Sequence, residues 1–503
     1  EQMIILDGKN LTLKQLHRIA RLHEVVKIDE KQHDCIHKAR VFVEDLVQEQ
    51  KPVYGINTGF GKLATESINK DEVTQLQKNL LMSHACGVGR MLDVDVVRAM
   101  LALRINALIK GFSGIRLSVI EKMVEFLNCD ITPVVYEKGS LGASGDLALL
   151  SHMSLPLIGL GDVIVDGKVM TSIEGLKIKG VKPIDHLLAK EGLSLINGTQ
   201  AMNAIGGLAL YDAIKLMKIS NMSFALSMEA LKGITSALDP KVHEIRGQEG
   251  QQIVASAMRN YLRNSGLAMP QDEKRVQDAY SLRCSPQVHG ASYDALKHIK
   301  DIVVREMNAV TDNPLIFADE KEAISAGNFH GQPLALAFDY LGIAMAELAN
   351  ISERRLERMV NPQLSNGLPA FLVKKSGLNS GFMIVQYTAA ALVSENKVLA
   401  HPASVDSIPS SANQEDHVSM GSIAARKART IIDHAYQVIS MEMMTACQAI
   451  DFRGKHLMGS TTKKVFDYIR EEIPFIDQDV IMHPYLVKIE EIIKEDSFLE
   501  LFE

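Results

Sequence analysis

The feature of this chain that most constrains its fold is a run of 33 residues, 199–231, that carries almost no charge. Four of its side chains are charged: Asp212, Lys215, Lys218 and Glu229. A helix that is apolar nearly all the way round is stable when it is buried in the middle of a large structure or an oligomer. The chain, at 503 residues, is long enough to bury such a helix. We therefore predict a mainly α fold with a long central helical bundle.

Helical spacing of apolar side chains recurs along the rest of the sequence. An apolar stripe at 341–351 and the pattern at 418–448 predict two further long helices. The most apolar stretch, 147–165, contains Pro156 and Asp162, and we interpret it as a buried helix followed by a turn. Shorter helical patterns precede these segments, at residues 11–30, 33–49 and 71–85.

Strand signals are few. The clearest lies at residues 162–170, where two short apolar runs flank Asp166-Gly167 and predict a hairpin. Residues 51–61 contain three glycines and cannot be helical throughout. Because the helical patterns lengthen after Gly114, we predict a small mixed N-terminal domain, residues 1–112, followed by a helical-bundle domain, residues 113–503.

The composition argues against several classes of function. The net charge is −7 and no basic tract stands out, so we do not expect a nucleic-acid partner. No segment has the pattern of a signal peptide or a membrane span. The five cysteines are scattered without CxxC spacing, which favours a reducing cytoplasm over a disulfide framework or a zinc site: Cys35, Cys86, Cys129, Cys284 and Cys447.

The segment Gly142-Ala-Ser-Gly-Asp146 carries the most unusual chemistry in the sequence. The amide nitrogen of Gly145 can attack the carbonyl of Ala143, because a glycine has no side chain to block the approach. Loss of two waters, one from ring closure and one from the Ser144 side chain, would leave a methylidene-imidazolone, a strong electrophile. The alternative is an ordinary turn into a helix, with Ser144 or Asp146 as the N-cap.

Several other loops hold polar residues that a helical bundle does not need. A lone Tyr, His or Arg in a loop is usually a surface residue, whereas several such loops in one chain indicate a site. The loops are 54–60, 83–87, 195–200, 277–287, 327–333 and 410–417.

Other enzyme classes match the sequence less well. A serine hydrolase needs Gly-x-Ser-x-Gly after a strand, but the segment here ends in Asp146. The run Gly59-Phe-Gly61-Lys-Leu-Ala64 loosely matches a dinucleotide fingerprint, yet no βαβ pattern surrounds it. The 16 histidines show neither His-Glu-x-x-His nor clustered ligands, so no metal is expected.

From about residue 3 to about residue 500, the chain resembles the ammonia-lyases that use a methylidene-imidazolone group, and among them the histidine ammonia-lyases. The most specific matching segments are Gly142-Ala-Ser-Gly-Asp146, Ser83-His84 and Asn413-Gln-Glu-Asp-His-Val-Ser-Met420. The last two separate histidine-using members from relatives that act on phenylalanine or tyrosine. One departure is Ala148-Leu149, where the family often has Ala-Pro, and it puts only the local helix geometry in doubt.

The resemblance implies a role for each matching catalytic residue. Ala143, Ser144 and Gly145 would form the electrophile without an external cofactor. Tyr54 would remove the β-proton of the substrate, with Glu415 as a further proton acceptor. Tyr280 would lie beside the electrophile together with Asn197 and stabilise developing negative charge.

The resemblance also implies a set of substrate-binding residues. Arg283 would hold the substrate carboxylate through a two-pronged contact, and Gln277 would hydrogen-bond nearby. His84 and Glu415 would hold the imidazole, whose two nitrogens need polar partners. Phe329 would shape the pocket. With Asn197 and Gln414, these complete the expected binding residues.

The implied reaction is the conversion of L-histidine to urocanate and ammonia in a homotetramer, with each site drawing on three subunits. No metal or organic cofactor is expected to be essential. Two enzyme alternatives share the scaffold: an aminomutase, and an ammonia-lyase for tyrosine or phenylalanine. From a different class, the chain could be an inactive helical scaffold or binding protein, which an uncyclised Ala143-Ser144-Gly145 would favour.

Overall fold

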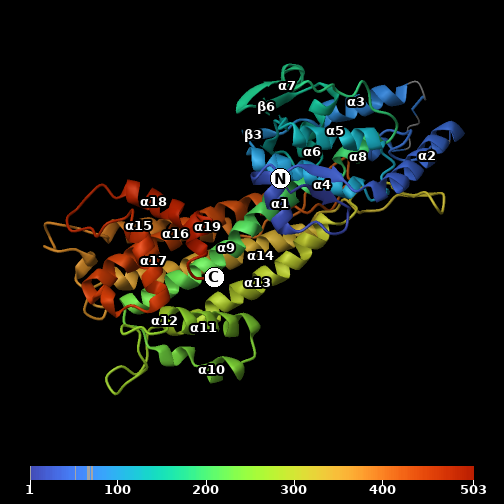
Figure 1. Cartoon of the computed structure of the whole chain (residues 1–503). Helices are drawn as coiled ribbons and strands as arrows, with labels where there is room; N and C mark the ends of the chain where they lie inside the picture. Colours follow the sequence, from blue (N-terminus) through green and yellow to red (C-terminus); the bar gives the residue numbers. More distant parts are fainter. Residues whose placement is uncertain (1, 51, 65–67, 70–71) are drawn as a thin grey trace. The chain divides into compact units, whose positions relative to one another are not determined.

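The computed structural model describes residues 2–50, 52–64, 68–69 and 72–503. As predicted, the fold is mainly α (Figure 1). Contacts between Cα atoms divide the chain into two compact units. The first comprises Glu1–Tyr211, Lys300–Asp339 and Pro402–Arg426, and the second comprises Asp212–Ile299, Tyr340–His401 and Lys427–Glu503. Residue 112 lies inside the first unit, and the division of the sequence into domains 1–112 and 113–503 stays a prediction.

The first unit is organised around α4, Val94–Leu108, in which every residue from Val97 to Leu108 is buried. This helix packs against α1, α5 and α6. Its Arg104 is fully buried and donates hydrogen bonds to the carbonyls of Ser194 and Thr311. The other helices that lie wholly in this unit are α1 Leu13–Arg21, α2 His33–Glu49, α3 Val73–His84, α5 Leu117–Asn128, α6 Leu147–Ser154, α7 Ser172–Lys179 and α8 Glu191–Ile196.

The strands of the described residues all belong to the first unit and form small sheets. The predicted hairpin is confirmed as β6 Asp162–Val165 and β7 Lys168–Thr171, which pair antiparallel. The remaining strands are β1 Ile4–Leu6 parallel to β2 Val26–Ile28, β3 Val88–Met91 antiparallel to β5 Tyr136–Lys138, β4 Thr132–Pro133 beside β6, and β8 Leu315–Phe317 antiparallel to β9 Glu322–Ile324.

Two expectations for short segments need correction or restriction. A helix over all of 11–30 is wrong, because α1 ends at Arg21 and β2 occupies Val26–Ile28. Val26 and Ile28 are buried while Lys27 is exposed, a two-residue period that matches β1 and overrides the weaker helical spacing. The pattern at 71–85 is confirmed as α3, Val73–His84. Asp71, where that pattern begins, lies outside the described residues, and so does Lys51, the first residue of the predicted glycine-rich loop.

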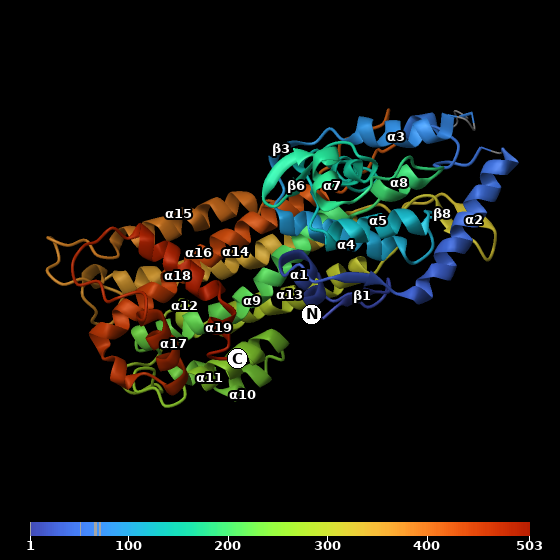
Figure 2. The same ribbon diagram turned by 45° about the horizontal axis from the view of Figure 1, so that its top comes forward.

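The second unit contains parts of four long helices that lie side by side in both views (Figure 2): α9 Gln200–Ala230, α13 Ser285–Met307, α14 Gln332–Val360 and α16 Gly421–Arg453. A fully buried ion pair joins Arg355 of α14 to Glu442 of α16, with Nε and Oε2 2.7 Å apart. Ser227 of α9 donates to the same carboxylate, and Arg355 donates to Ser285 of α13. The shorter helices of this unit are α10 Pro240–Glu244, α11 Glu249–Tyr261, α12 Tyr280–Arg283, α15 Met383–Leu399, α17 Ser460–Arg470, α18 His483–Lys494 and α19 Asp496–Leu499.

The charge-free run is the buried helix that its composition predicts. It forms α9, and its residues are buried except around Asp212, Lys215 and Lys218, while its fourth charged residue, Glu229, is buried. Among the described helices, α14 is long and apolar enough to cross a membrane by composition, but 61% of its most apolar window is buried inside the structure. A core helix passes the same test, so this feature gives weak evidence for a membrane span.

Candidate active site

A cavity of about 490 Å³ lies in the first unit. Five of the predicted site residues line it: Tyr54, His84, Ser144, Asn197 and Glu415. They come from five separate segments of the chain, and Ser144 and Glu415 are 271 residues apart in sequence. The other lining residues are Gly59, Phe60, Leu63, Ile68, Leu76, Asn79, Leu80, Ser83, Leu147, Leu193 and Ser411. The cavity therefore combines an apolar wall with a few polar groups, as small-molecule sites do.

The predicted electrophile segment forms a tight turn at the start of α6. Gly142, Ser144 and Gly145 all have left-handed backbone angles, with φ of 80°, 54° and 80°. A side chain on Gly145 is excluded, because a Cβ there would lie 2.1 Å from the carbonyl oxygen of Gly198. The backbone oxygen of Phe329 would lie 3.1 Å from the same position. The surrounding chain thus compresses this turn from outside and requires glycine at 145.

Asp146 anchors the turn through its buried side chain. Its Oδ1 accepts a hydrogen bond from Ser140 Oγ at 2.8 Å, and its Oδ2 accepts one from the amide of Met202 at 2.8 Å. Burial raises the pKa of this carboxyl to about 6. Asp146 occupies the N-cap position of α6 without capping it through its side chain. The alternative of an ordinary capped turn therefore fails for Asp146, whose carboxylate ties the turn to the start of α9 instead.

Ser144 and Glu415 meet in the cavity. Ser144 Oγ donates a hydrogen bond to Glu415 Oε1 at 2.9 Å. Ser410 Oγ donates to the other carboxylate oxygen, Oε2, at 3.1 Å, and the backbones of Ser410 and Glu415 also pair. The carboxylate is thus held on both oxygens and directed at the side chain of Ser144.

His84 is the last residue of α3, and it is positioned by its neighbour. The hydroxyl of Ser83 lies 2.9 Å from Nδ1 of His84. Burial lowers the pKa of His84, and the charge of Glu415 offsets part of that shift. The lowered pKa favours the neutral imidazole, in which one nitrogen donates and the other accepts a hydrogen bond.

Tyr54 sits in the glycine-rich loop that breaks the helical pattern. Its ring makes an edge contact with Phe60, with centroids 6.4 Å apart. Gly55 follows with φ of 76°, and a Cβ there would lie 2.6 Å from Leu193 and 2.9 Å from Pro314. The loop therefore packs its backbone closely against α8 and the 311–314 segment, which fixes the direction of the Tyr54 side chain.

Asn197 presents a free acceptor to the cavity. Its side chain is 2% exposed, and its Nδ2 donates to the carbonyl of Asn313 at 3.0 Å. Its Oδ1 is buried and has no hydrogen-bond partner among the described residues. A buried oxygen without a hydrogen bond destabilises the folded chain unless a ligand donates one to it. Asn197 Oδ1 can therefore accept a hydrogen bond from a bound ligand.

Two other predicted residues of the first unit lie nearby without lining the cavity. Phe329 contributes its backbone carbonyl beside Gly145. Gln414 is exposed, and its amide donates to the carbonyl of Ser411. Their assignment to substrate binding stays a prediction.

The three remaining predicted residues lie together in the second unit. Arg283 Nη1 donates to Gln277 Oε1 at 3.0 Å, and the Arg283 guanidinium carbon lies 4.8 Å from the centre of the Tyr280 ring. Arg283 Nε is buried without a hydrogen-bond partner among the described residues. An arginine with a free donor beside a polar side chain is suited to a carboxylate. That these residues serve the same site as the cavity in the first unit stays a prediction.

Sequence reasoning missed several side chains that build the cavity. Leu76, Asn79 and Leu80 share one face of α3, because Asn79 and Leu80 follow Leu76 by three and four residues. That spacing was available from the sequence, although nothing in it indicates that the face lines a cavity rather than the core. The contacts that Ser140 and Ser410 make could not be predicted, because their partners are brought near only by the folded loops.

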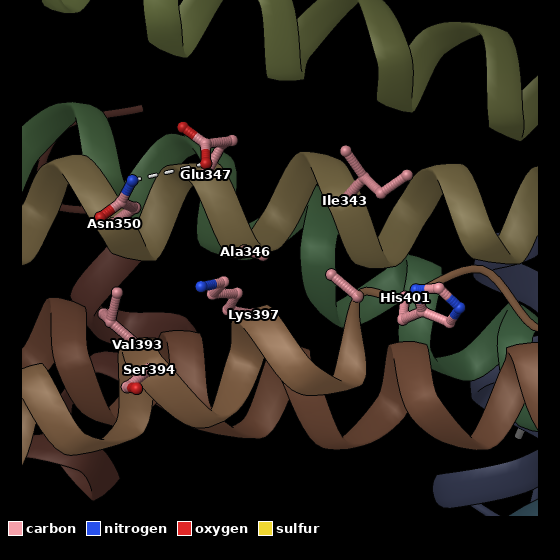
Figure 3. Close-up of a pocket in the computed structure, with 9 residues that line it drawn as sticks. Ile343, Ala346, Glu347, Asn350, Val393, Ser394, Lys397 and His401 are labelled. Atoms are coloured by element: carbon pink, nitrogen blue, oxygen red, sulfur yellow. Dashed lines mark hydrogen bonds between the residues drawn. The ribbon is translucent and has the colours of Figure 1, made fainter.

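A second cavity, of about 460 Å³, lies in the second unit between α14 and α15 (Figure 3). Glu347 and Asn350 project from α14, linked by a hydrogen bond of 3.4 Å, and Val393, Ser394 and Lys397 project from α15. None of the predicted site residues lines it. Across the described ranges there is no cluster of three or more His, Cys, Asp or Glu side chains suited to a metal. The cavity of the first unit is therefore the candidate site.

Known proteins of similar sequence cover almost the whole chain. The family profile described as aromatic amino acid lyase matches residues 11–471. The chain is 54% identical over 500 residues to histidine ammonia-lyase 2 of Fusobacterium nucleatum subsp. nucleatum, covering 99% of this chain and 98% of that protein.

Two solved structures are similar over nearly the whole chain. Histidine ammonia-lyase from Trypanosoma cruzi aligns with a TM-score of 0.93 at 41% identity, covering 100% of this chain and 95% of that one. Tyrosine aminomutase from Streptomyces globisporus aligns with a TM-score of 0.95 at 36% identity, covering 99% and 98%.

Proposed function

The chain belongs to the aromatic amino acid lyase family, and from that membership we propose that it converts L-histidine to urocanate and ammonia. The observation that carries the proposal is the cavity in which Ser144 lies beside two groups suited to an imidazole, His84 and Glu415. It is a carbon–nitrogen lyase by family, and the polar lining of this cavity supports histidine as its substrate.

The residues at 142–146 fit a self-formed 4-methylidene-imidazol-5-one. Three left-handed residues fold the turn on itself, and the carbonyl of Gly198 closes the space where a side chain at 145 would stand. Ala143, Ser144 and Gly145 would hold the group within the chain, so that no external cofactor or metal is required. The group supplies an electrophile, which none of the ordinary side chains offers.

The side chains of the cavity have distinct proposed tasks. Tyr54 takes the β-proton of the substrate, and Asn197 Oδ1 accepts a hydrogen bond from its amine. His84 and Glu415 bind the two nitrogens of the substrate imidazole. His84 does so through a ring nitrogen, and Glu415 does so through its carboxylate. Leu76, Leu80 and Leu193 line the apolar wall and exclude water from the proton transfer. Glu415 also serves as a second proton acceptor.

The proposal extends to the residues of the second unit and to assembly. Arg283 would hold the substrate carboxylate, with Gln277 hydrogen-bonded to it and Tyr280 stacked on it. A homotetramer whose sites combine residues of three chains belongs to the same proposal, and membership of the aromatic amino acid lyase family supports it. The five cysteines are free thiols, which supports a cytoplasmic enzyme.

Substrate comparison with product analysis tests the proposal. L-Histidine should give urocanate and ammonia, and L-phenylalanine should react on the order of 10⁴-fold more slowly, because it leaves His84 and Glu415 unpaired. Comparable rates for the two amino acids would refute the specificity. A β-amino acid product would instead identify an aminomutase, and an inactive chain whose intact mass retains both waters would identify a scaffold.

A further inference from the structure

We propose that Glu415 is the acid that expels the hydroxyl of Ser144 as water while the electrophile forms, a maturation step that precedes any turnover. The inference rests on the proposed function, because it assumes that Ala143, Ser144 and Gly145 cyclise. It adds a third task for Glu415 that is separate from substrate binding and from proton transfer during the reaction.

The oxygen that must leave, Ser144 Oγ, is in contact with Glu415. Ser144 Oγ donates to Glu415 Oε1 at 2.9 Å in the uncyclised chain. A substrate imidazole has not yet been bound at this stage, so this carboxylate is free to serve the serine. When the carboxyl is protonated, the same contact runs in the opposite direction, and Glu415 donates to Oγ. General acids act at this separation, about 2.6–3.2 Å between heavy atoms.

The backbone around Ser144 supports the same reading. Ser144 has a φ of 54°, a left-handed conformation that is unfavourable for a residue other than glycine. Asp146 and Ser140 hold the turn from one side, and Gly142 is packed so closely that a Cβ there would lie 2.1 Å from Ser419 Oγ. The serine side chain is therefore directed into the cavity, toward the carboxylate.

The carboxylate is itself positioned for this task. Ser410 Oγ donates to Oε2 at 3.1 Å, which leaves Oε1 directed at Ser144. Residues 411–413 have positive φ angles of 50°, 53° and 69°, so the loop between Ser410 and Glu415 is tightly turned. A short, turned loop fixed at both ends limits the positions that the Glu415 side chain can take.

Formation of the electrophile removes two waters from the chain. In ring closure, Gly145 N bonds to Ala143 C, and the oxygen of Ala143 leaves as water with the amide protons of Gly145 and Ser144. In the second loss, the Cβ–Oγ bond of Ser144 breaks. Oγ leaves as water with its own proton and one from Glu415, while the Cα proton of Ser144 passes to solvent water. A solvent proton then restores Glu415, so the net change is the loss of two waters.

Intact mass during maturation tests the proposal directly. The full chain and its Glu415→Gln variant would be made by pulsed cell-free synthesis and followed by mass spectrometry with time. The wild type should become lighter by two waters. Glu415→Gln, which keeps the hydrogen-bonding shape but cannot carry the proton, should accumulate a species lighter by one water and lose the second at least about 100-fold more slowly. Because the chain has no tryptophan, the near-ultraviolet absorbance of the conjugated ring gives a second readout.

Matched variants separate this role from general damage to the loop. Asp416→Asn removes the exposed neighbouring carboxylate and should mature at the wild-type rate. Ser144→Ala cannot lose the side-chain water and marks the mass of a chain blocked at that step. Ser410→Ala leaves the carboxyl in place but removes its support, and should slow the second loss by less than Glu415→Gln does, which keeps the test open if Glu415→Gln fails to fold.

The outcomes distinguish the role of Glu415 from the formation of the electrophile itself. Loss of both waters from Glu415→Gln at the wild-type rate would overturn the proposal, and so would a folded Glu415→Gln chain that loses neither. A wild-type chain that loses no water would instead refute the electrophile on which the proposed function rests.

Discussion

Tyr54 carries the sharpest prediction for a single side chain. The Tyr54→Phe substitution removes one oxygen and keeps the ring contact with Phe60, so the loop should keep its packing. If the phenol oxygen takes the β-proton, turnover of histidine should fall by about 10²–10⁴-fold. Proton removal should also become more rate-limiting, which a larger isotope effect with β-deuterated histidine would reveal. The intact mass should still show the loss of both waters, because cyclisation depends on Ala143, Ser144 and Gly145. A variant that retains most of its turnover would transfer the base role to Glu415 or Tyr280.

Glu306 predicts a pH-dependent effect on stability. Burial raises the pKa of this carboxyl, in α13, to about 7. Between about pH 4.5 and pH 7 the folded state keeps a proton that the unfolded state releases, so rising pH destabilises the folded chain across this window. Glu306→Gln removes that penalty. The variant should match the wild type near pH 4.5 and exceed it by on the order of 3 kcal/mol at pH 8. Thermal unfolding at pH 5 and pH 8 measures this, and an equal difference at both values would contradict it.

At the scale of elements, a buried ion pair supports the segment that holds Asn197. Lys190, at the start of α8, and Asp312 are both fully buried, with Nζ and Oδ2 2.6 Å apart. Asp312 Oδ1 also accepts from the amide of Asn313, whose carbonyl accepts from Asn197. Lys190→Met should cost about 3–5 kcal/mol of stability, because it leaves a buried carboxylate unpaired.

A double variant distinguishes the lost charge from lost packing. Lys190→Met with Asp312→Asn removes both charges of the pair and retains an oxygen for the amide of Asn313, so it should recover much of the loss in urea unfolding. Lys463→Met breaks an exposed pair with Asp467 and should change stability little. A double variant no more stable than Lys190→Met alone would show that the charge is not the cause.

The elements that the sequence predicted are those with long, regular patterns. The α9, α14 and α16 helices each show an apolar pattern over many residues. The β6–β7 hairpin is marked by Asp166-Gly167 at its turn. β2 was missed because three residues are too few to compete with a neighbouring helical pattern, and its pairing with β1 depends on residues more than 20 positions away. Local periodicity carries no information about such pairing.

The candidate site followed a similar rule. Residues within recognisable motifs, such as Ser144 and His84, could be named from the sequence. The hydrogen bonds that support the site could not be predicted, because they join residues that are remote along the chain: Asp146 bonds to Met202, 56 residues away, and Asn197 bonds to Asn313, 116 residues away. Hydrogen bonds of this kind depend on the folded arrangement of several loops, which no spacing within one segment encodes.

For the whole molecule, the proposed site needs both Tyr54 and Arg283, which belong to different compact units. The proposed tetramer would draw Tyr54 from one chain and Arg283 from another. Closed assemblies of identical chains present the same surfaces repeatedly, so each site would be completed by the same pair of partners.

Complementation between two inactive variants tests shared sites. A Tyr54→Phe chain and an Arg283→Ala chain, each carrying a different affinity tag, would be co-expressed and purified on both tags in turn. If each site takes the two residues from different chains, random assembly leaves about a quarter of the sites with both native side chains, and activity should recover to about that fraction. If one chain supplies both residues, every site lacks one of them and activity should stay at the level of the parents. Mixing the two separately assembled enzymes provides the control, since stable assemblies should not exchange chains. A fully active monomer in sedimentation would contradict the assembly altogether, because Tyr54 and Arg283 would then act within one chain.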